Sequence, residues 1–226
     1  MRSNLLVGKI RRDIAGSALV EYTVVFPVFI LVTLGTVDVT YMLYEWALAD
    51  KATYVGARAA VVSNPVAPKI TEDKLLYSQN QLAKMGQFCF DFTTGAGNGN
   101  CPASTVKVDC TSTACTPNTF GFDGSAFTNV NGTGIFDRMK VIFPRLQPRN
   151  VMISYELNGS GYVGRPGGLP MNVTVKIQNM THRIYFLAGI MRFFGGTFAS
   201  TPAIPAFATT LTSEDMTTKS SAKQPI

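Results

Sequence analysis

The chain has 226 residues, of which 46% are apolar and only 15% charged, and its formal net charge is +6. This composition is typical of neither a disordered chain nor a highly charged cytosolic enzyme, and the length suits a membrane segment followed by one domain of common size. Four basic residues and one acidic residue lie among positions 1–16, so much of the positive charge is N-terminal. That placement indicates a positive-inside topology signal rather than a nucleic-acid-binding surface.

A long helix is predicted over residues 17–62. Its part from about 19 to 38 is almost wholly apolar and is predicted to span the membrane. At about 1.5 Å per residue, the helix covers roughly 24 Å between Tyr22 and Asp38, close to a hydrocarbon thickness of about 30 Å. The sequence therefore predicts a single-pass membrane protein.

Beyond Asp38 the same helix is predicted to be amphipathic, because apolar residues recur at spacings of three and four with charged residues among them. The apolar series is Tyr41, Met42, Trp46, Leu48, Ala49, Ala52, Val55, Ala59 and Val62, and the charged residues are Glu45, Asp50, Lys51 and Arg58. Tyr41, Tyr44 and Trp46 lie where an interfacial aromatic belt is expected. Asn64-Pro65 is predicted to end the helix, because the residue before a proline disfavours the α conformation.

Residues 63–216 are predicted to form one α+β domain, with a polar tail over 217–226. Thr71 is the predicted N-cap of a short helix over 71–85. Alternating apolar residues in "NVMISYEL" and "MNVTVKIQ" predict two strands that form a hairpin with one buried face. The predicted fold is thus a long N-terminal helix followed by a small antiparallel sheet with disulfide-pinned loops.

Four cysteines, all beyond the apolar segment, decide the predicted compartment. Their even number indicates disulfides, and of three possible pairings we favour the local one, Cys89 with Cys101 and Cys110 with Cys115. No C-x-x-C spacing is present and the chain has one histidine, so no metal site is predicted. Because disulfides form in oxidising compartments, the domain is predicted to be extracytoplasmic and the basic N-terminus cytoplasmic.

No cofactor, nucleotide site or catalytic activity is predicted. Residues 159–164 fit G-x-G-x-x-G, but the Pro- and Gly-rich residues 165–170 cannot begin the helix that a dinucleotide site requires. His182 is interpreted as a structural side chain on a predicted strand. No serine lies in a G-x-S-x-G elbow.

Glu21 lies a few residues inside the apolar segment. A carboxylate at membrane depth costs several kcal/mol unless it is neutralised or paired. Glu21 is therefore expected either to have a specific partner or to reach the headgroup region.

Basic residues followed by Gly16 and then "SALVEY" before an apolar helix resemble the processing region of type IV pilin-like proteins. The segment "VEYTVVFP", with Pro27 six residues after Glu21, more specifically resembles the TadE-like minor pilins of tight-adherence (Flp) pili. Gly56-Ala57-Arg58 is similar to the continuation of that family's helix. The resemblance covers about residues 10–62.

The resemblance implies that a prepilin peptidase removes the leader 1–16 by cleaving between Gly16 and Ser17, where alanine is more usual than serine. Glu21 would then be the fifth mature residue and would pair with the N-terminal amine of a neighbouring subunit, and Tyr22 and Pro27 belong to the same assembly segment. The implied function is that of a minor pilin or pseudopilin in a type IVb-like pilus used in adhesion. Its implied partners are the peptidase, other major and minor pilins, the assembly machinery and the bacterial inner membrane.

Two alternatives stay open at this point. The helix could serve only to tether an extracytoplasmic binding module. The segment Ala47-Leu48-Ala49 resembles a signal-peptidase site, which would release a secreted domain.

Overall fold

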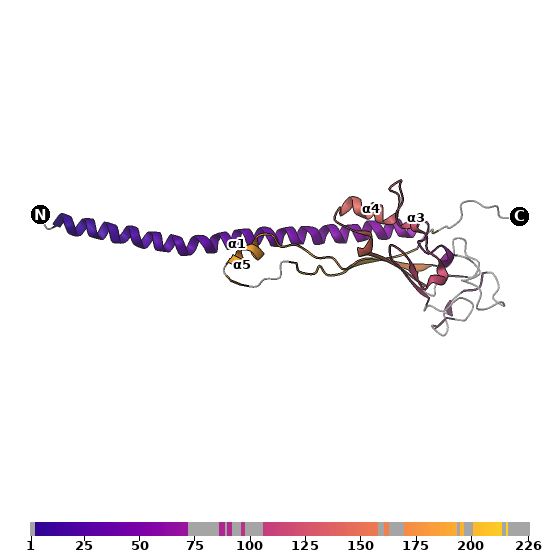
Figure 1. The fold of residues 1–226 in the computed structure, drawn as a ribbon. Helices are drawn as coiled ribbons and strands as arrows, with labels where there is room; N and C mark the ends of the chain where they lie inside the picture. Colours follow the sequence, from indigo (N-terminus) through magenta and orange to yellow (C-terminus); the bar gives the residue numbers. More distant parts are fainter. Residues whose placement is uncertain are drawn as a thin grey trace. The chain divides into compact units, whose positions relative to one another are not determined.

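The computed structural model describes residues 3–71, 86–88, 90–91, 96–97, 106–157, 161–162, 170–193, 195–196, 201–213 and 216 (Figure 1). Of these, residues 3–18, 71, 90–91, 96–97 and 193 are described by their backbone alone. The chain forms two compact units. Unit 1 comprises Met1–Glu45 and Thr181–Ala203, and unit 2 comprises Trp46–Met180 and Ile204–Ile226.

Helix α1 runs from Ser3 to Val62 and contributes to both units. The predicted long helix and its end before Asn64-Pro65 are confirmed, and the helix also continues backward through the predicted leader. It passes through Pro27, which removes one backbone hydrogen bond that membrane helices tolerate losing.

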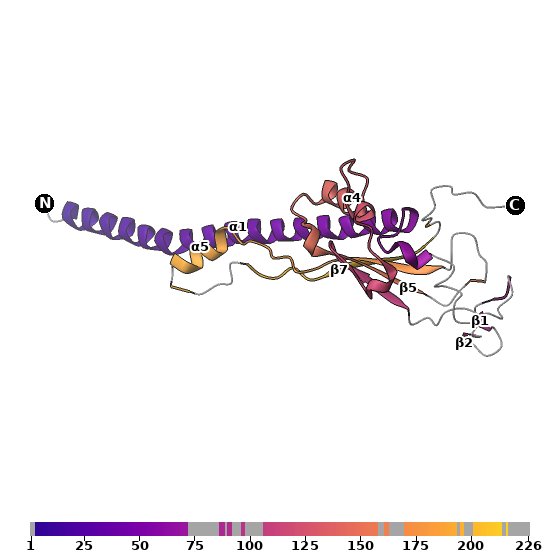
Figure 2. The ribbon, with the colours of Figure 1, turned by 45° about the vertical axis from the view of Figure 1, so that its right-hand side comes forward.

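Unit 1 includes residues 181–203, which interrupt unit 2 in the sequence and are named here the α5 segment. A bridge between Thr181 and Ala203 closes its base, and it contains helix α5, Phe186–Phe193. Both ribbon views show α5 beside the middle of α1 (Figures 1 and 2). His182 lies next to the bridge and outside any strand, so its predicted strand position is wrong.

Unit 2 is built on a five-stranded antiparallel sheet of order β4-β3-β5-β6-β7. Its strands are β3 Lys107–Cys110, β4 Cys115–Thr116, β5 Val151–Leu157, β6 Met171–Ile177 and β7 Phe207–Thr212. The predicted hairpin is confirmed as β5–β6, in which Val151 pairs with Ile177 and Leu157 with Met171. A separate pair, β1 Phe90–Asp91 and β2 Ala96–Gly97, is also antiparallel.

Short helices connect the strands of unit 2. They are η1 Pro68–Thr71, η2 Asn118–Phe120, α3 Gly124–Phe127, α4 Ile135–Ile142 and η3 Pro148–Asn150. Thr71, the predicted N-cap, is the last residue of η1. The rest of that predicted helix lies outside the described residues, as do most of the 159–164 motif and the tail 217–226.

The predicted Cys110–Cys115 disulfide is confirmed and links adjacent positions of β3 and β4. Cys89 and Cys101, the other predicted pair, lie outside the described residues.

The C-terminal part of α1 packs into the core of unit 2 through small residues. Ala49, Ala52, Ala57 and Ala60 are fully buried. Gly56 is where the backbone comes closest, because an added Cβ would lie 2.6 Å from Met139 Sδ and 3.2 Å from Val175 Cγ1. The small side chains therefore let the helix approach β6 and α4 directly.

Three residues of the amphipathic part of α1 have surroundings that the apolar spacing alone does not predict. Val62, the last member of the apolar series, is the last residue of the helix and is 58% exposed. Glu45, one of the charged residues among the apolar positions, is buried within unit 1, where it contacts His182. The Trp46 ring packs edge-on against Phe207 within unit 2.

Tyr155 lies at the centre of the sheet and is fully buried. Its hydroxyl oxygen accepts a hydrogen bond from the Val66 amide at 3.0 Å. Burial raises the pKa of the Tyr155 phenol far above its ordinary value, and the hydrogen bond from Val66 lowers it only in part.

Candidate membrane and assembly site

The N-terminal part of α1 exposes a largely apolar surface. Every side chain from Leu19 to Phe29 is exposed, and within Leu19–Val62 an 18-residue stretch that is long and apolar enough to cross a bilayer is only 6% buried. An apolar surface of this extent is stable when lipid or other helices cover it. This part of α1 is suited to act as a membrane anchor.

Glu21 lies on this exposed surface, and no described side chain of the chain pairs with it. One residue on, the Tyr22 ring stacks on Phe26 at 5.2 Å between centroids. Gly16 and Ser17 lie in the helical backbone just before the described side chains. The sequence-predicted residues Gly16, Ser17, Glu21, Tyr22 and Pro27 thus lie on one helix, and the side chains of Glu21, Tyr22 and Pro27 are exposed.

The polar hydroxyls of the exposed apolar stretch are satisfied by the helix itself. Thr23 donates to the Val20 carbonyl at 2.8 Å, and Thr33 donates to the Phe29 carbonyl at 2.9 Å. A hydroxyl bonded in this way does not need water, so it is compatible with a lipid environment.

Asp38 binds the first turn of α5. Its carboxylate accepts hydrogen bonds from the amides of Tyr185, Phe186 and Leu187 at 3.2, 2.9 and 2.7 Å. Because the first amides of a helix have no partner within it, Asp38 acts as an N-cap supplied by another helix. Only 4% of Asp38 is exposed.

A second buried polar contact lies two turns further along α1. His182 Nδ1 is 2.6 Å from Glu45 Oε2, and the two side chains are 1% and 2% exposed. The Tyr41 ring lies 5.7 Å from the His182 ring. This contact and the Asp38 cap hold both ends of the stretch 182–187 against α1.

Comparison with known protein families decides the assignment of the N-terminal region. Residues 16–58 match the family model described as TadE-like protein. The chain carries a TadE-like N-terminal region. No curated protein and no solved structure is detectably similar to the chain.

The TadE-like region confirms the resemblance drawn from the sequence and associates the protein with the Tad pilus system and its membrane. It contains all the predicted cleavage and assembly residues and the motif Gly56-Ala57-Arg58. It also contains Asp38 and Glu45, to which sequence reasoning assigned no partners.

A signal for these two residues was present in the sequence. Asp38 and Glu45 are seven positions apart, so they lie on one face of an otherwise apolar helix, and carboxylates so placed need hydrogen-bond donors. The donors come from residues 182–187, more than 130 positions away, and no periodicity within the TadE-like region points to them.

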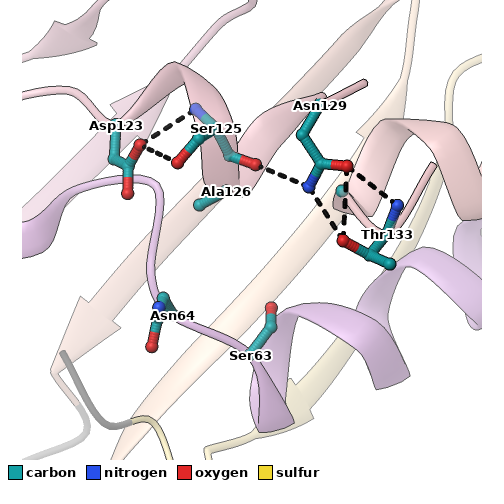
Figure 3. Close-up of a pocket in the computed structure, with 8 residues that line it drawn as sticks. Ser63, Asn64, Asp123, Ser125, Ala126, Asn129 and Thr133 are labelled. Atoms are coloured by element: carbon teal, nitrogen blue, oxygen red, sulfur yellow. Dashed lines mark hydrogen bonds between the residues drawn. The ribbon is translucent and has the colours of Figure 1, made fainter. Parts of the chain in front are cut away.

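Unit 2 contains a polar pocket of about 200 Å³ between the end of α1 and the loops around α3 (Figure 3). Asp123 accepts hydrogen bonds from the amide and hydroxyl of Ser125, and Asn129 binds Ser125 and Thr133. These side chains are thus used to hold their own loops. Within the described part of the chain, no group of three or more His, Cys, Asp or Glu residues is placed to hold a metal ion.

Proposed function

We propose that the protein is a non-enzymatic minor pilin or pseudopilin of a Tad pilus, inserted by α1 and processed by a prepilin peptidase between Gly16 and Ser17. The observation that carries this proposal is Glu21, which lies exposed on an exposed apolar helix within the TadE-like region. Such a carboxylate is available to a partner outside its own chain.

The physical argument concerns the cost of charge in lipid. Cleavage would create an α-ammonium at Ser17, four residues and about 6 Å of helix from Glu21. A carboxylate and an ammonium are each costly at membrane depth and less costly as a pair, so Glu21 of one subunit would bind the amine of its neighbour. Cleavage also removes the basic leader, which could not enter the bilayer.

The proposed topology follows from charge and disulfide chemistry. The basic N-terminus would stay on the cytoplasmic side of the inner membrane, and the Cys110–Cys115 disulfide favours an oxidising compartment for unit 2. Other major and minor pilins and the assembly machinery are the proposed partners, and adhesion is the proposed role of the assembled pilus.

The first experiment determines the N-terminal residue of the protein isolated from its native envelope, with and without the prepilin peptidase. The proposal expects Ser17, and an uncut chain in the peptidase mutant. A start at Asp50 in both strains would instead indicate an ordinary signal peptide and would contradict the proposal.

The second experiment tests Glu21 directly with Glu21→Ala. We expect at least about a tenfold loss of the protein from sheared pili, because removing one member of a buried charge pair costs about 3–5 kcal/mol. Formation of the Cys110–Cys115 disulfide should be unchanged. Thr23→Ala, at an exposed uncharged position two residues away, is the matched control and should assemble normally. Normal piliation with Glu21→Ala would overturn the proposed role.

A further inference from the structure

The α5 segment contacts α1 within its apolar stretch. An added Cβ on Gly35 would lie 3.8 Å from Leu187 Cδ1, and Leu187 also lines an apolar groove with Leu31, Val32 and Val39. Leu31, Val32 and Gly35 belong to the last turns of the predicted membrane span, and Val39 directly follows it. Because the start of α5 contacts residues 31–39 of α1, both must lie at the same depth in a membrane.

Successive residues of the segment contact α1 progressively closer to its N-terminus. The Tyr185 ring lies 6.1 Å from the Tyr41 ring, the Phe186 amide binds Asp38, and Leu187 lies against Gly35. The chain therefore enters α5 from the Tyr41 level and runs toward the most apolar part of α1.

Three exposed tyrosines mark the level at which α5 begins. Tyr41, Tyr44 and Tyr185 are 39%, 58% and 55% exposed, and the Tyr41 ring is near both of the others. Tyrosines gather at the boundary between lipid and water, where the ring is in apolar surroundings and the hydroxyl is wet. Two separate stretches of the chain thus contribute to one aromatic level.

The composition of the α5 segment is that of an interfacial helix. Residues 184–191 contain no charged side chain and are flanked by Arg183 and Arg192, both exposed. The Arg183 guanidinium lies 5.8 Å from the centroid of the Tyr185 ring, at the aromatic level. Arginine side chains beside a short apolar helix favour the headgroup level of a membrane, where the guanidinium binds lipid phosphates.

We propose that α5 is a second membrane-contacting element, whose exposed Phe186 and partly exposed apolar residues enter the headgroup and upper acyl region of the bilayer beside α1. The inference rests on the proposed anchoring of α1 and adds a binding partner, phospholipid, for the α5 segment. The buried Asp38 cap and the Glu45–His182 contact are what fix this segment to the anchor.

The test measures membrane depth with single tryptophans in the full chain. Trp46 is the only tryptophan, so Trp46→Phe gives a silent background. Phe186→Trp probes α5 at a half-exposed position, Phe29→Trp probes the anchor, and Val130→Trp probes a fully exposed position in unit 2. Each variant is reconstituted in phosphatidylethanolamine–phosphatidylglycerol vesicles containing lipids brominated at shallow or deep acyl positions, and quenching is recorded.

We expect the Phe29→Trp variant to be quenched most by deep bromines, the Phe186→Trp variant most by shallow ones, and the Val130→Trp variant by neither. Quenching at position 29 with none at 186 would overturn the inference and leave the proposed anchor standing. Absence of quenching at both positions would contradict the anchor itself, and with it the proposed function. Formation of the Cys110–Cys115 disulfide in each variant verifies folding.

Discussion

The Tyr155 hydroxyl is the described partner of the buried Val66 amide, so its removal should leave that amide unsatisfied. We expect Tyr155→Phe to lower the free energy of unfolding by about 1–3 kcal/mol, the cost of a buried donor without an acceptor. The measurement is urea unfolding of the full chain in detergent micelles, followed by near-UV circular dichroism. Tyr162→Phe, at a tyrosine that is 39% exposed, is the matched control and should cost much less.

Wild type and the Tyr155→Phe variant also test the pKa of the Tyr155 phenol, through the pH dependence of the free energy of unfolding. Burial raises the pKa of Tyr155 in the folded state, so above the ordinary tyrosine pKa of about 10 only the unfolded state ionises. The stability that Tyr155 contributes is therefore complete below pH 10 and is lost as the pH rises above it. The difference between wild type and Tyr155→Phe should narrow above pH 10 by up to about 1.4 kcal/mol per pH unit. A constant difference would contradict the assigned pKa shift.

Gly56 tests the close approach of α1 in unit 2. Alanine in a helix interior gains up to about 1 kcal/mol over glycine, but the added Cβ would overlap Met139, which is itself fully buried, and overpacking costs about 1–3 kcal/mol. We expect Gly56→Ala to be destabilising by about 1 kcal/mol in urea unfolding. Gly189→Ala in α5, where an added Cβ meets nothing within 4 Å, should not be destabilising. A stabilised Gly56→Ala variant would show that Met139 moves aside freely.

At the scale of the secondary-structure elements, the sequence predicts those helices and strands whose residues follow a clear local pattern of apolar and polar positions. The apolar run and Asn64-Pro65 define α1, and strict alternation defines β5 and β6. Strands β3 and β4 are four and two residues long, too short for alternation to be recognised. Strand β7, "FATTLT", is rich in threonine and alternates only half-buried and exposed positions, so its sequence resembles a loop.

The residues of the candidate site also fall into those that local spacing identifies and those that only the fold brings together. Gly16, Ser17, Glu21 and Pro27 are consecutive features of one helix, and their spacing alone identifies them. The Asp38 and Glu45 contacts join residues that are distant in sequence, and only the fold brings them together.

Asp38 also yields a prediction for α5 as an element. Asp38→Ala removes the acceptor for three amides, and loss of an N-cap costs about 0.5–2 kcal/mol. We expect the amides of residues 185–187 to exchange hydrogen about two- to thirtyfold faster in the detergent-solubilised full chain. Asp50→Ala, which removes an exposed carboxylate from the same helix, is the control and should leave their exchange unchanged.

At the scale of the whole molecule, α1 has an exposed N-terminal part and a C-terminal part that is buried on one side. From residue 19 to 29 its side chains are exposed, and from Ala49 to Val61 small apolar residues form part of the core of unit 2. A helix used only as a tether would need no particular sequence in its exposed part, whereas a helix that packs against sister helices needs Glu21 and a specific surface around it. The two functional hypotheses therefore differ in what residues 19–30 must do.

Replacing residues 19–30 by a leucine–alanine helix of equal length separates these hypotheses, and it leaves the contacts of residues 31–45 with the α5 segment in place. The pilin proposal expects normal membrane insertion but at least about a tenfold loss of protein from sheared pili, because neither the carboxylate nor the packing surface remains. A second replacement that retains Glu21 shows how much of the loss the carboxylate alone restores. Full function of the first replacement would favour the tethered binding module, since an anchor needs only length and apolarity.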